Sequence, residues 1–360
     1  MTIKRAAPVQ TQEYGTLLDG RRVQAWTLTH GGLSLTAITL GGIVTRLWVP
    51  DRAGRLANVV LGFDALQDYV DRSPHFGTIV GRYANRIAGA SLPLDGQIHT
   101  LSRNDGPNCL HGGARGFGTR LWEAVHAGPT DDGGLALQMH YTSADGEEGF
   151  PGELRVQVRY TLGADQSWRI DYEAQTDGPT VVNLTHHAYF NLAGGGTALA
   201  HRLTIHGSRY TQVDADLVPV GLADVAQTPF DFRQPTLIDL RVRDPDPQLL
   251  RARGYDHCWW LDDSLADAQA LRRAARLEDP ASGRWMEVST REPTLQFYSG
   301  NFLDGTLAGA GGRLIRQGDG VCLETQHAPD SPHQPGWPST VLRPGHSYHS
   351  ATVHRFGADG

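Results

Sequence analysis

One short segment of the chain combines an apolar strand pattern with two adjacent histidines. The segment is VVNLTHHAYFNL, residues 181–192. In an extended strand, alternate side chains point to opposite faces, so Asn183 and His187 share one face while His186 lies on the other. Adjacent histidines on opposite faces cannot reach one ligand, which disfavours a metal site here. The polar face is either solvated or lines a cleft, where an imidazole can donate or accept a proton near neutral pH. We expect it to line a cleft, with His187 pointing inward.

A second segment places a carboxylate inside an apolar run. In GVCLETQHAPDSPHQP, residues 320–335, an extended backbone puts Glu324 on the same face as Cys322 and Gln326. Burying a carboxylate is unfavourable unless it has partners or a chemical role. Desolvation raises its pKa from about 4.3 and makes it a better base near neutrality. Glu324 is therefore either a structural carboxylate held by backbone or Arg groups, or a general base.

Three further segments place polar side chains among glycines or aromatic residues. Glycine allows backbone to approach a ligand closely, and aromatic rings either contact sugar faces or fill a core. Each segment therefore has a structural and a ligand-binding interpretation, and we expect His257 to be structural. The segments are GRYANRIAGA (81–90) with Arg82, Asn85 and Arg86, NDGPNCLHGGARGFG (104–118) with His111, and GYDHCWW (254–260) with Asp256 and His257.

The elements that must position these residues are predicted to be β-strands. Apolar and polar residues alternate with period two in 135–141, 154–161 and 168–175, and turn-like segments separate them. Strands at this spacing indicate a large antiparallel β structure, and the chain shows no βαβ alternation. Helical patterns are weak: 64–70 predicts one short helix, and 262–275 fits either a helix or a surface loop.

Composition narrows the functional classes. The chain has 360 residues, 39% hydrophobic and 20% charged, which is typical of a globular protein. A net charge of -7 argues against non-specific nucleic-acid binding, and no apolar run is long enough to span a bilayer. The N-terminus does not read as a signal peptide, and the three cysteines form no CxxC pair, so we expect a reduced, cytoplasmic protein. The chain also lacks a P-loop and a GxGxxG fingerprint.

Taken together, these segments resemble the aldose 1-epimerases, or galactose mutarotases. LHGG, NLTxHxYFNL, GYDH and ETQHxPDSPxxP occur in the family's order, GRYANRI and LQFYSGNFLDG match too, and the resemblance runs from about 15 to 355. It implies one domain over 1–360, mainly β, with the large antiparallel β-sandwich of the galactose mutarotase-like supersandwich. It also implies a free monosaccharide substrate and no cofactor or metal. Two positions depart from the family, which commonly has Asn where this chain has His186 and His333.

The resemblance also implies roles for individual residues. Glu324 would be the general base and His187 the general acid of sugar ring opening, which predicts a bell-shaped pH profile with an acid limb from Glu324 and a basic limb from His187. The remaining pocket residues would contact the sugar: His111 beside the ring, Arg86 and Asp256 on hydroxyls, and Asn85 and Gln296 as further lining residues.

Three alternatives compete with this interpretation. A glycoside hydrolase would use two carboxylates, for which Asp256 and Glu324 are available. A sugar-binding protein without turnover would have a similar cleft. An epimerase for hexose phosphates would need extra cations, for which Arg82, Arg103 and Arg115 are available. We expect a monomer, and the sequence leaves open which aldose is preferred among galactose, glucose, xylose and arabinose.

Overall fold

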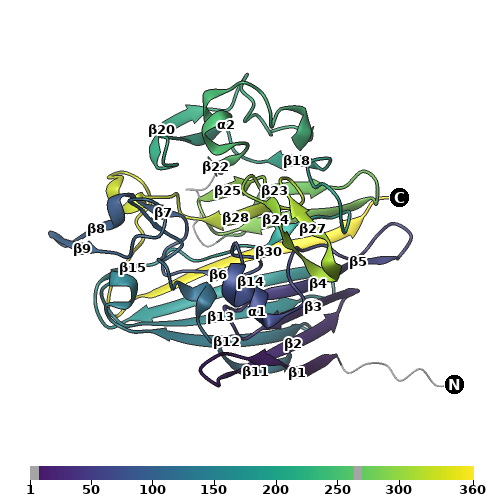
Figure 1. Ribbon diagram of the computed structural model, residues 1–360, viewed down its shortest axis with the longest axis horizontal. Helices are drawn as coiled ribbons and strands as arrows, with labels where there is room; N and C mark the ends of the chain where they lie inside the picture. The colour runs from purple at the N-terminus through teal and green to yellow at the C-terminus, as the bar shows by residue number, and fades with distance from the viewer. Residues whose placement is uncertain (1–7, 263–269) are drawn as a thin grey trace.

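The computed structural model describes residues 8–262 and 270–360, and antiparallel strands dominate it (Figure 1). Three sheets contain most of the strands, with nine, six and five members. This confirms the mainly β, antiparallel architecture predicted from the alternating segments. Among the described residues, no helix is long and apolar enough to cross a membrane.

The nine-stranded sheet extends across the molecule (Figure 1). Its strands in spatial order are β11 (Glu123–Pro129), β12 (Leu135–Ser143), β13 (Leu154–Leu162), β14 (Ser167–Thr176), β30 (Ser347–Ala358), β24 (Arg284–Thr290), β23 (Arg272–Glu278), β18 (Arg202–Ile205) and β21 (Thr236–Leu237). The three alternating segments form β12, β13 and β14. Every second residue of β13 is buried, as a strand with one face on the core requires.

The six-stranded sheet packs against the nine-stranded one and forms the second layer. Its order is β17 (Tyr189–Phe190), β28 (Val321–Gln326), β25 (Thr294–Tyr298), β22 (Asp256–Trp260), β19 (Arg209–Val213) and β20 (Pro219–Asp224). Every residue of β28 is buried, so both faces of this strand are covered. The Oγ1 atoms of Thr325 on β28 and Thr352 on β30 lie 2.6 Å apart. Thr325 therefore faces the nine-stranded sheet, and the adjacent Glu324 points away from it.

A five-stranded sheet covers another part of the nine-stranded sheet. It contains, in order, β1 (Val9–Thr16), β2 (Arg22–His30), β3 (Leu33–Ile38), β4 (Val44–Pro50) and β5 (Leu56–Asn58). The Tyr160 hydroxyl donates 2.7 Å to the carbonyl of Gly42, which links β13 to the turn after β3. One large apolar cluster contains residues of all three sheets, so the layers share a single core.

Short elements complete the fold. The small two-stranded ladders pair β7 (Arg86–Ile87) with β10 (Cys109–Leu110), β6 (Ile79–Val80) with β16 (Thr185–His186), β15 (Thr180–Val181) with β29 (Val341–Leu342), β8 (Ser91–Leu94) with β9 (Gln97–Thr100), and β26 (Asp304–Ala308) with β27 (Leu314–Arg316). The helix predicted at 64–70 is α1 (Leu66–Arg72), and α2 (Pro247–Ala252) was not predicted. Of the ambiguous segment 262–275, residues 272–275 belong to β23, and 263–269 lie outside the described residues.

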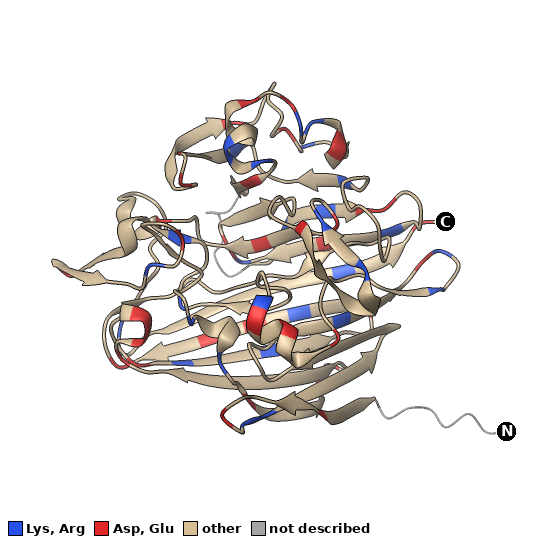
Figure 2. Ribbon diagram, in the orientation of Figure 1, with Lys and Arg blue, Asp and Glu red and all other residues tan. Residues whose placement is uncertain are grey.

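Charged residues of both signs are interspersed over the described chain (Figure 2). Several form neighbouring ion pairs on strands, such as Arg276 with Glu287 at 3.0 Å and Arg155 with Glu153 at 2.9 Å.

Candidate active site

The 181–192 segment divides its side chains between core and site, as the strand pattern predicts. Leu184 is fully buried in the main core, and His186 packs edge-on against Trp168 with 4.9 Å between ring centroids. His187 points to the opposite side, toward Glu324. Asn183 shares the phase of His187 but has a different task, since it accepts a 2.9 Å hydrogen bond from the His327 backbone and ties two segments together.

Three groups far apart in the sequence meet at this point. Nε2 of His187 lies 3.8 Å from Oε2 of Glu324, and both residues are almost completely buried. One nitrogen of His111 joins them, so that the three donor atoms all lie within 4.8 Å of one another. The strand β28 supplies Glu324, the segment between β16 and β17 supplies His187, and the residue after β10 supplies His111. The structure therefore brings together the acid, base and second imidazole named by the family resemblance.

Neighbouring atoms fix which ring nitrogens face the site. The backbone N–H of Asn85 donates to Nδ1 of His111 at 3.1 Å, which leaves Nε2 of that ring outward. Sγ of Cys322 lies 3.5 Å from Nδ1 of His187, which leaves Nε2 toward Glu324. Each imidazole thus presents Nε2 to the cluster. Cys322 and Glu324 share a face of β28, as predicted, and the thiol supports the ring that faces the carboxylate.

Burial shifts the pKa values of Glu324 and His187 in opposite directions. Desolvation, followed by the nearby charge of Asp256, raises the pKa of Glu324 well above its usual value, although Arg86 opposes this. Desolvation, with a smaller contribution from His75, lowers the pKa of His187 to about 3. Both shifts favour the uncharged form of each group. The directions of these shifts are the reverse of the reference pKa order behind the predicted limbs, acid from Glu324 and basic from His187, and a pH–rate measurement decides between the two orders.

The other predicted polar residues surround this cluster. Arg86 is buried and donates through Nε to Asp105 at 2.7 Å. Gln296 donates to Asp256 at 2.7 Å, and its Oε1 has no hydrogen-bond partner among the described residues. Desolvation raises the pKa of Asp256, with Arg86 opposing.

Asn85 is hydrogen-bonded to two other residues of the site. Its backbone carbonyl accepts from the His111 backbone N–H at 3.0 Å, and its side-chain oxygen accepts from the Arg86 backbone N–H at 2.8 Å. The residue was predicted to line the pocket, and these contacts give it a positioning task. It holds both His111 and Arg86 in place.

The cluster also has a donor set that metals use. Two imidazole nitrogens and one carboxylate oxygen within 4.8 Å of one another match the ligand types of Zn²⁺ and non-haem iron. His111, His187 and Glu324 are the described residues that could hold such an ion. The same three groups can also donate and accept protons without such an ion.

Several residues singled out in the sequence have structural tasks. The buried guanidinium of Arg82 donates to the carbonyl oxygens of Gly152 at 2.7 Å and Pro151 at 2.9 Å, and also to Ser143 and Thr180. Arg82 is therefore occupied inside the fold and is unavailable to bind a phosphate. His257 is fully buried and packs on Phe230, in agreement with its predicted structural role.

One site residue was missed altogether. His75 follows α1, and its ring centroid lies 4.8 Å from that of His111 and 5.7 Å from that of His187. The segment SPHFG carries no spacing or residue pattern that connects it with the distant histidines, and only the fold brings it to them.

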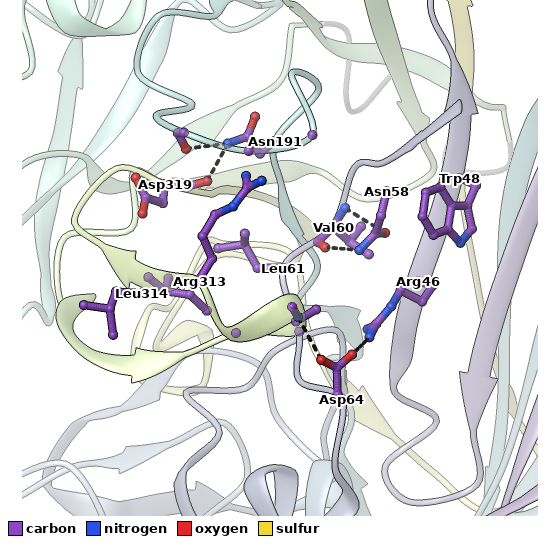
Figure 3. Close-up of a pocket in the computed structure, with 18 residues that line it drawn as sticks. Arg46, Trp48, Asn58, Val60, Leu61, Asp64, Asn191, Arg313, Leu314 and Asp319 are labelled. Atoms are coloured by element: carbon purple, nitrogen blue, oxygen red, sulfur yellow. Dashed lines mark hydrogen bonds and ion pairs between the residues drawn. The ribbon is translucent and has the colours of Figure 1, made fainter. Parts of the chain in front are cut away.

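A separate hollow of about 360 Å³ lies beside β5 and β27 (Figure 3). Its polar side chains are largely bound to one another or to backbone. Asp64 pairs with Arg46 and accepts from the Gly311 N–H at 2.8 Å, while Asn191 donates to the Asp319 carbonyl at 2.8 Å. His111, His187 and Glu324 do not line this hollow, so it is distinct from the cluster that they form.

Known proteins resemble the chain over nearly its whole length. The family model described as aldose 1-epimerase matches residues 24–355. Galactose mutarotase from Homo sapiens is 41% identical, with 97% of this chain and 99% of that protein covered. Aldose 1-epimerase from Escherichia coli K12 is 36% identical, with 95% and 97% covered. Among solved structures, the galactose 1-epimerase from Lactobacillus acidophilus has a TM-score of 0.84 at 26% identity, with 98% and 99% covered. An aldose epimerase homologue from C. elegans has a TM-score of 0.83 at 28% identity, with 92% and 97% covered.

Proposed function

Because the chain belongs to the aldose 1-epimerase family, we propose that it interconverts the α and β anomers of free aldoses such as galactose and glucose, with Glu324 and His187 as its proton-transfer pair. The observation that carries this assignment is the buried pair itself. Nε2 of His187 and Oε2 of Glu324 face each other at 3.8 Å, and that Glu324 oxygen has no hydrogen-bond partner in the described part of the chain. A buried carboxylate oxygen without a partner is unfavourable unless a ligand satisfies it.

The reaction requires one base and one acid at neighbouring oxygens. Glu324 removes the proton from the C1 hydroxyl, the C1–O5 bond breaks, and His187 donates a proton to O5. The open-chain aldehyde rotates about the C1–C2 bond, and O5 then attacks the other face of C1. On closure His187 takes its proton back from O5 while Glu324 returns its proton to O1. Both groups end in their starting states, and the sugar changes only its configuration at C1.

The shared proton must change its place before this sequence begins. With each group in the form that burial favours, the proton lies on Glu324, because burial raises the pKa of that carboxyl and lowers the pKa of His187 to about 3. The base form requires the proton on His187, and the positive charge of Arg86 favours ionised Glu324. The two arrangements contain the same number of protons, so the pH profile reports the pair as a whole.

The surrounding polar groups fit sugar hydroxyls better than a phosphate. Asp256 and the free Oε1 of Gln296 are acceptors, and Nε2 of His111 faces the same cluster. The buried cation Arg82 is engaged by backbone carbonyls, which disfavours the hexose-phosphate alternative. We further propose that the enzyme acts as a monomer in a reducing compartment such as the cytoplasm. Every group of the relay comes from one chain, and Cys109, Cys258 and Cys322 are buried free thiols.

Polarimetry tests the proposed function. Freshly dissolved α-D-galactose or α-D-glucose should reach anomeric equilibrium faster with the protein than without it. Incubation with an aryl galactoside should release no phenol, since hydrolysis would support the glycoside hydrolase alternative. Binding of sugar without acceleration of mutarotation would instead indicate a sugar-binding protein, and would contradict the proposal.

A further inference from the structure

His75 is a third imidazole at the site, beside His111 and His187, and the proposed reaction does not use it. Its ring stands edge-on to His111 at 4.8 Å and roughly parallel to His187 at 5.7 Å. The residue is only partly buried, unlike its two neighbours. Within the described residues, neither of its ring nitrogens makes a hydrogen bond. His75 thus borders the buried cluster, is more exposed than its two neighbours, and has an unused donor and an unused acceptor.

The loop that presents His75 is fixed to the segment that presents His187. The Gly77 N–H donates to the His187 carbonyl at 3.0 Å, and the His187 N–H donates to the Thr78 carbonyl at 2.9 Å. The Tyr189 hydroxyl donates to the Pro74 carbonyl at 2.8 Å. These bonds lie on both sides of residue 75, so the position of its ring relative to His187 is set by the backbone.

The backbone at His75 adopts an uncommon conformation. Its φ is 65°, in the left-handed region that a few per cent of non-glycine residues occupy, with histidine among the more tolerant types. Ten other described non-glycine residues share this region, among them Asn85 and His111 at the same site. The pinned loop holds His75 in this conformation, and the conformation directs the imidazole toward the cluster.

His75 lies beside the imidazole that would act on the ring oxygen of the sugar. His75 contacts His187 and His111 but lies outside the group of donor atoms that includes Glu324. In the proposed reaction Glu324 acts on the C1 hydroxyl and His187 on the ring oxygen, which is bonded to C1 and C5. C5 is therefore the neighbour of the ring oxygen that lies away from the hydroxyl on which Glu324 acts.

We propose that His75 contacts the substituent at C5 of the pyranose and so sets the preference between hexoses and pentoses. The inference rests on the proposed function, because it uses the placement of O5 at His187. A hexose carries a hydroxymethyl group at C5, whose hydroxyl can both donate to and accept from an imidazole. A pentopyranose carries only hydrogen there and leaves the ring nitrogens of His75 without that partner.

Pairs of sugars that differ only at C5 test this proposal. D-Xylose has the ring configuration of D-glucose without C6, and L-arabinose has that of D-galactose. Mutarotation of all four is followed by polarimetry with wild type, His75→Phe and His75→Asn. Phe keeps an aromatic ring without nitrogens, and Asn tolerates the positive φ while keeping a donor and an acceptor. His346→Phe is a matched control, because His346 is an exposed histidine in the turn before β30.

The expected result is a selective loss. His75→Phe should lower kcat/KM for glucose and galactose about 10-fold, mainly through KM, which is the effect of one lost hydrogen bond of about 1.4 kcal/mol. The values for xylose and arabinose should stay within about 2-fold, His75→Asn should retain part of the hexose preference, and His346→Phe should change nothing. Equal losses on hexoses and pentoses, or no loss on either, would overturn the proposal. If wild type accelerated none of the four sugars, the proposed function itself would fail, which is a different and recognisable result.

Discussion

Replacing Glu324 by Gln separates a catalytic carboxyl from a structural one. Gln keeps the shape of the side chain but cannot remove a proton, so turnover should fall by about 10²–10⁴, the usual contribution of general acid–base catalysis. That corresponds to about 2.7–5.4 kcal/mol of transition-state stabilisation. The same substitution should leave the fold intact or strengthen it.

The stability effect follows from the raised pKa of Glu324. The folded protein holds this proton more tightly than the unfolded chain, whose carboxyl has a pKa near 4.5. As pH rises above that value, the unfolded chain loses the proton first, so the group lowers the free energy of unfolding. Each unit by which the folded pKa exceeds the unfolded pKa lowers the free energy of unfolding by about 1.4 kcal/mol once the pH is above both values. Glu324→Gln removes the effect, and its melting temperature at pH 7 should exceed that of wild type.

The chain offers a matched control in Glu292. This glutamate is 3% exposed, against 2% for Glu324, but it is fully partnered. Burial alone would raise the pKa of Glu292, yet His327 at 2.7 Å, Ser350 and Tyr348 hold it below its usual value. Its contribution to stability is present above the unfolded pKa and is lost as pH falls. Glu292→Gln should therefore lower the melting temperature at pH 7 and leave mutarotation nearly unchanged.

Polarimetry on α-D-galactose and thermal unfolding measure the two properties on the same samples. The reasoning predicts opposite patterns: lost activity with retained stability for Glu324→Gln, and retained activity with lost stability for Glu292→Gln. Full activity in Glu324→Gln would refute the base assignment. A loss of both activity and stability in that variant would show that the carboxyl supports the fold.

The remaining predictions concern the other imidazoles and the pH profile. His187→Asn should lower turnover by about 10²–10⁴ without loss of melting temperature, and a smaller effect would remove it as the acid. The pH–rate profile should have an acid limb from His187 and an alkaline limb from Glu324. Asp256→Asn should move the alkaline limb to lower pH, because it removes a negative charge that raises the Glu324 pKa; an unmoved limb would contradict this electrostatic account. His186→Phe should keep activity within a few-fold and raise stability by about 1–3 kcal/mol, because both buried nitrogens of His186 lack partners among the described residues. The gain in stability should be largest below pH 6.5. In that range the imidazole of the unfolded chain is protonated, whereas burial keeps His186 neutral in the folded protein. Calorimetry at pH 5 and pH 8 measures this difference.

The sequence predicted the layers and the phase of the site strands. Period-two alternation identified β12, β13 and β14, and it placed His186 and His187 on opposite faces. The resemblance to a family named the residues that the fold then brings together. Alternation could not predict that the Asn183 side chain accepts a hydrogen bond from the His327 backbone, because it predicts the face of a side chain and not the segment that packs on that face.

Other features depend on contacts between distant segments. Burial raises the pKa of Glu324 and lowers that of His187, whereas their reference values have the opposite order. This burial depends on other segments of the fold. The place of His75 depends on hydrogen bonds between the loop after α1 and the segment around His187. No local pattern in the sequence records such bonds.

The way this loop is attached has an evolutionary consequence. The three hydrogen bonds that join it to the segment around His187 use backbone atoms of the loop, from Pro74, Gly77 and Thr78, and none uses the side chain at position 75. Residue 75 can therefore be exchanged while the attachment of the loop to His187 is preserved. A single substitution at position 75 can therefore change substrate preference, in evolution or by engineering, while Glu324 and His187 keep their positions.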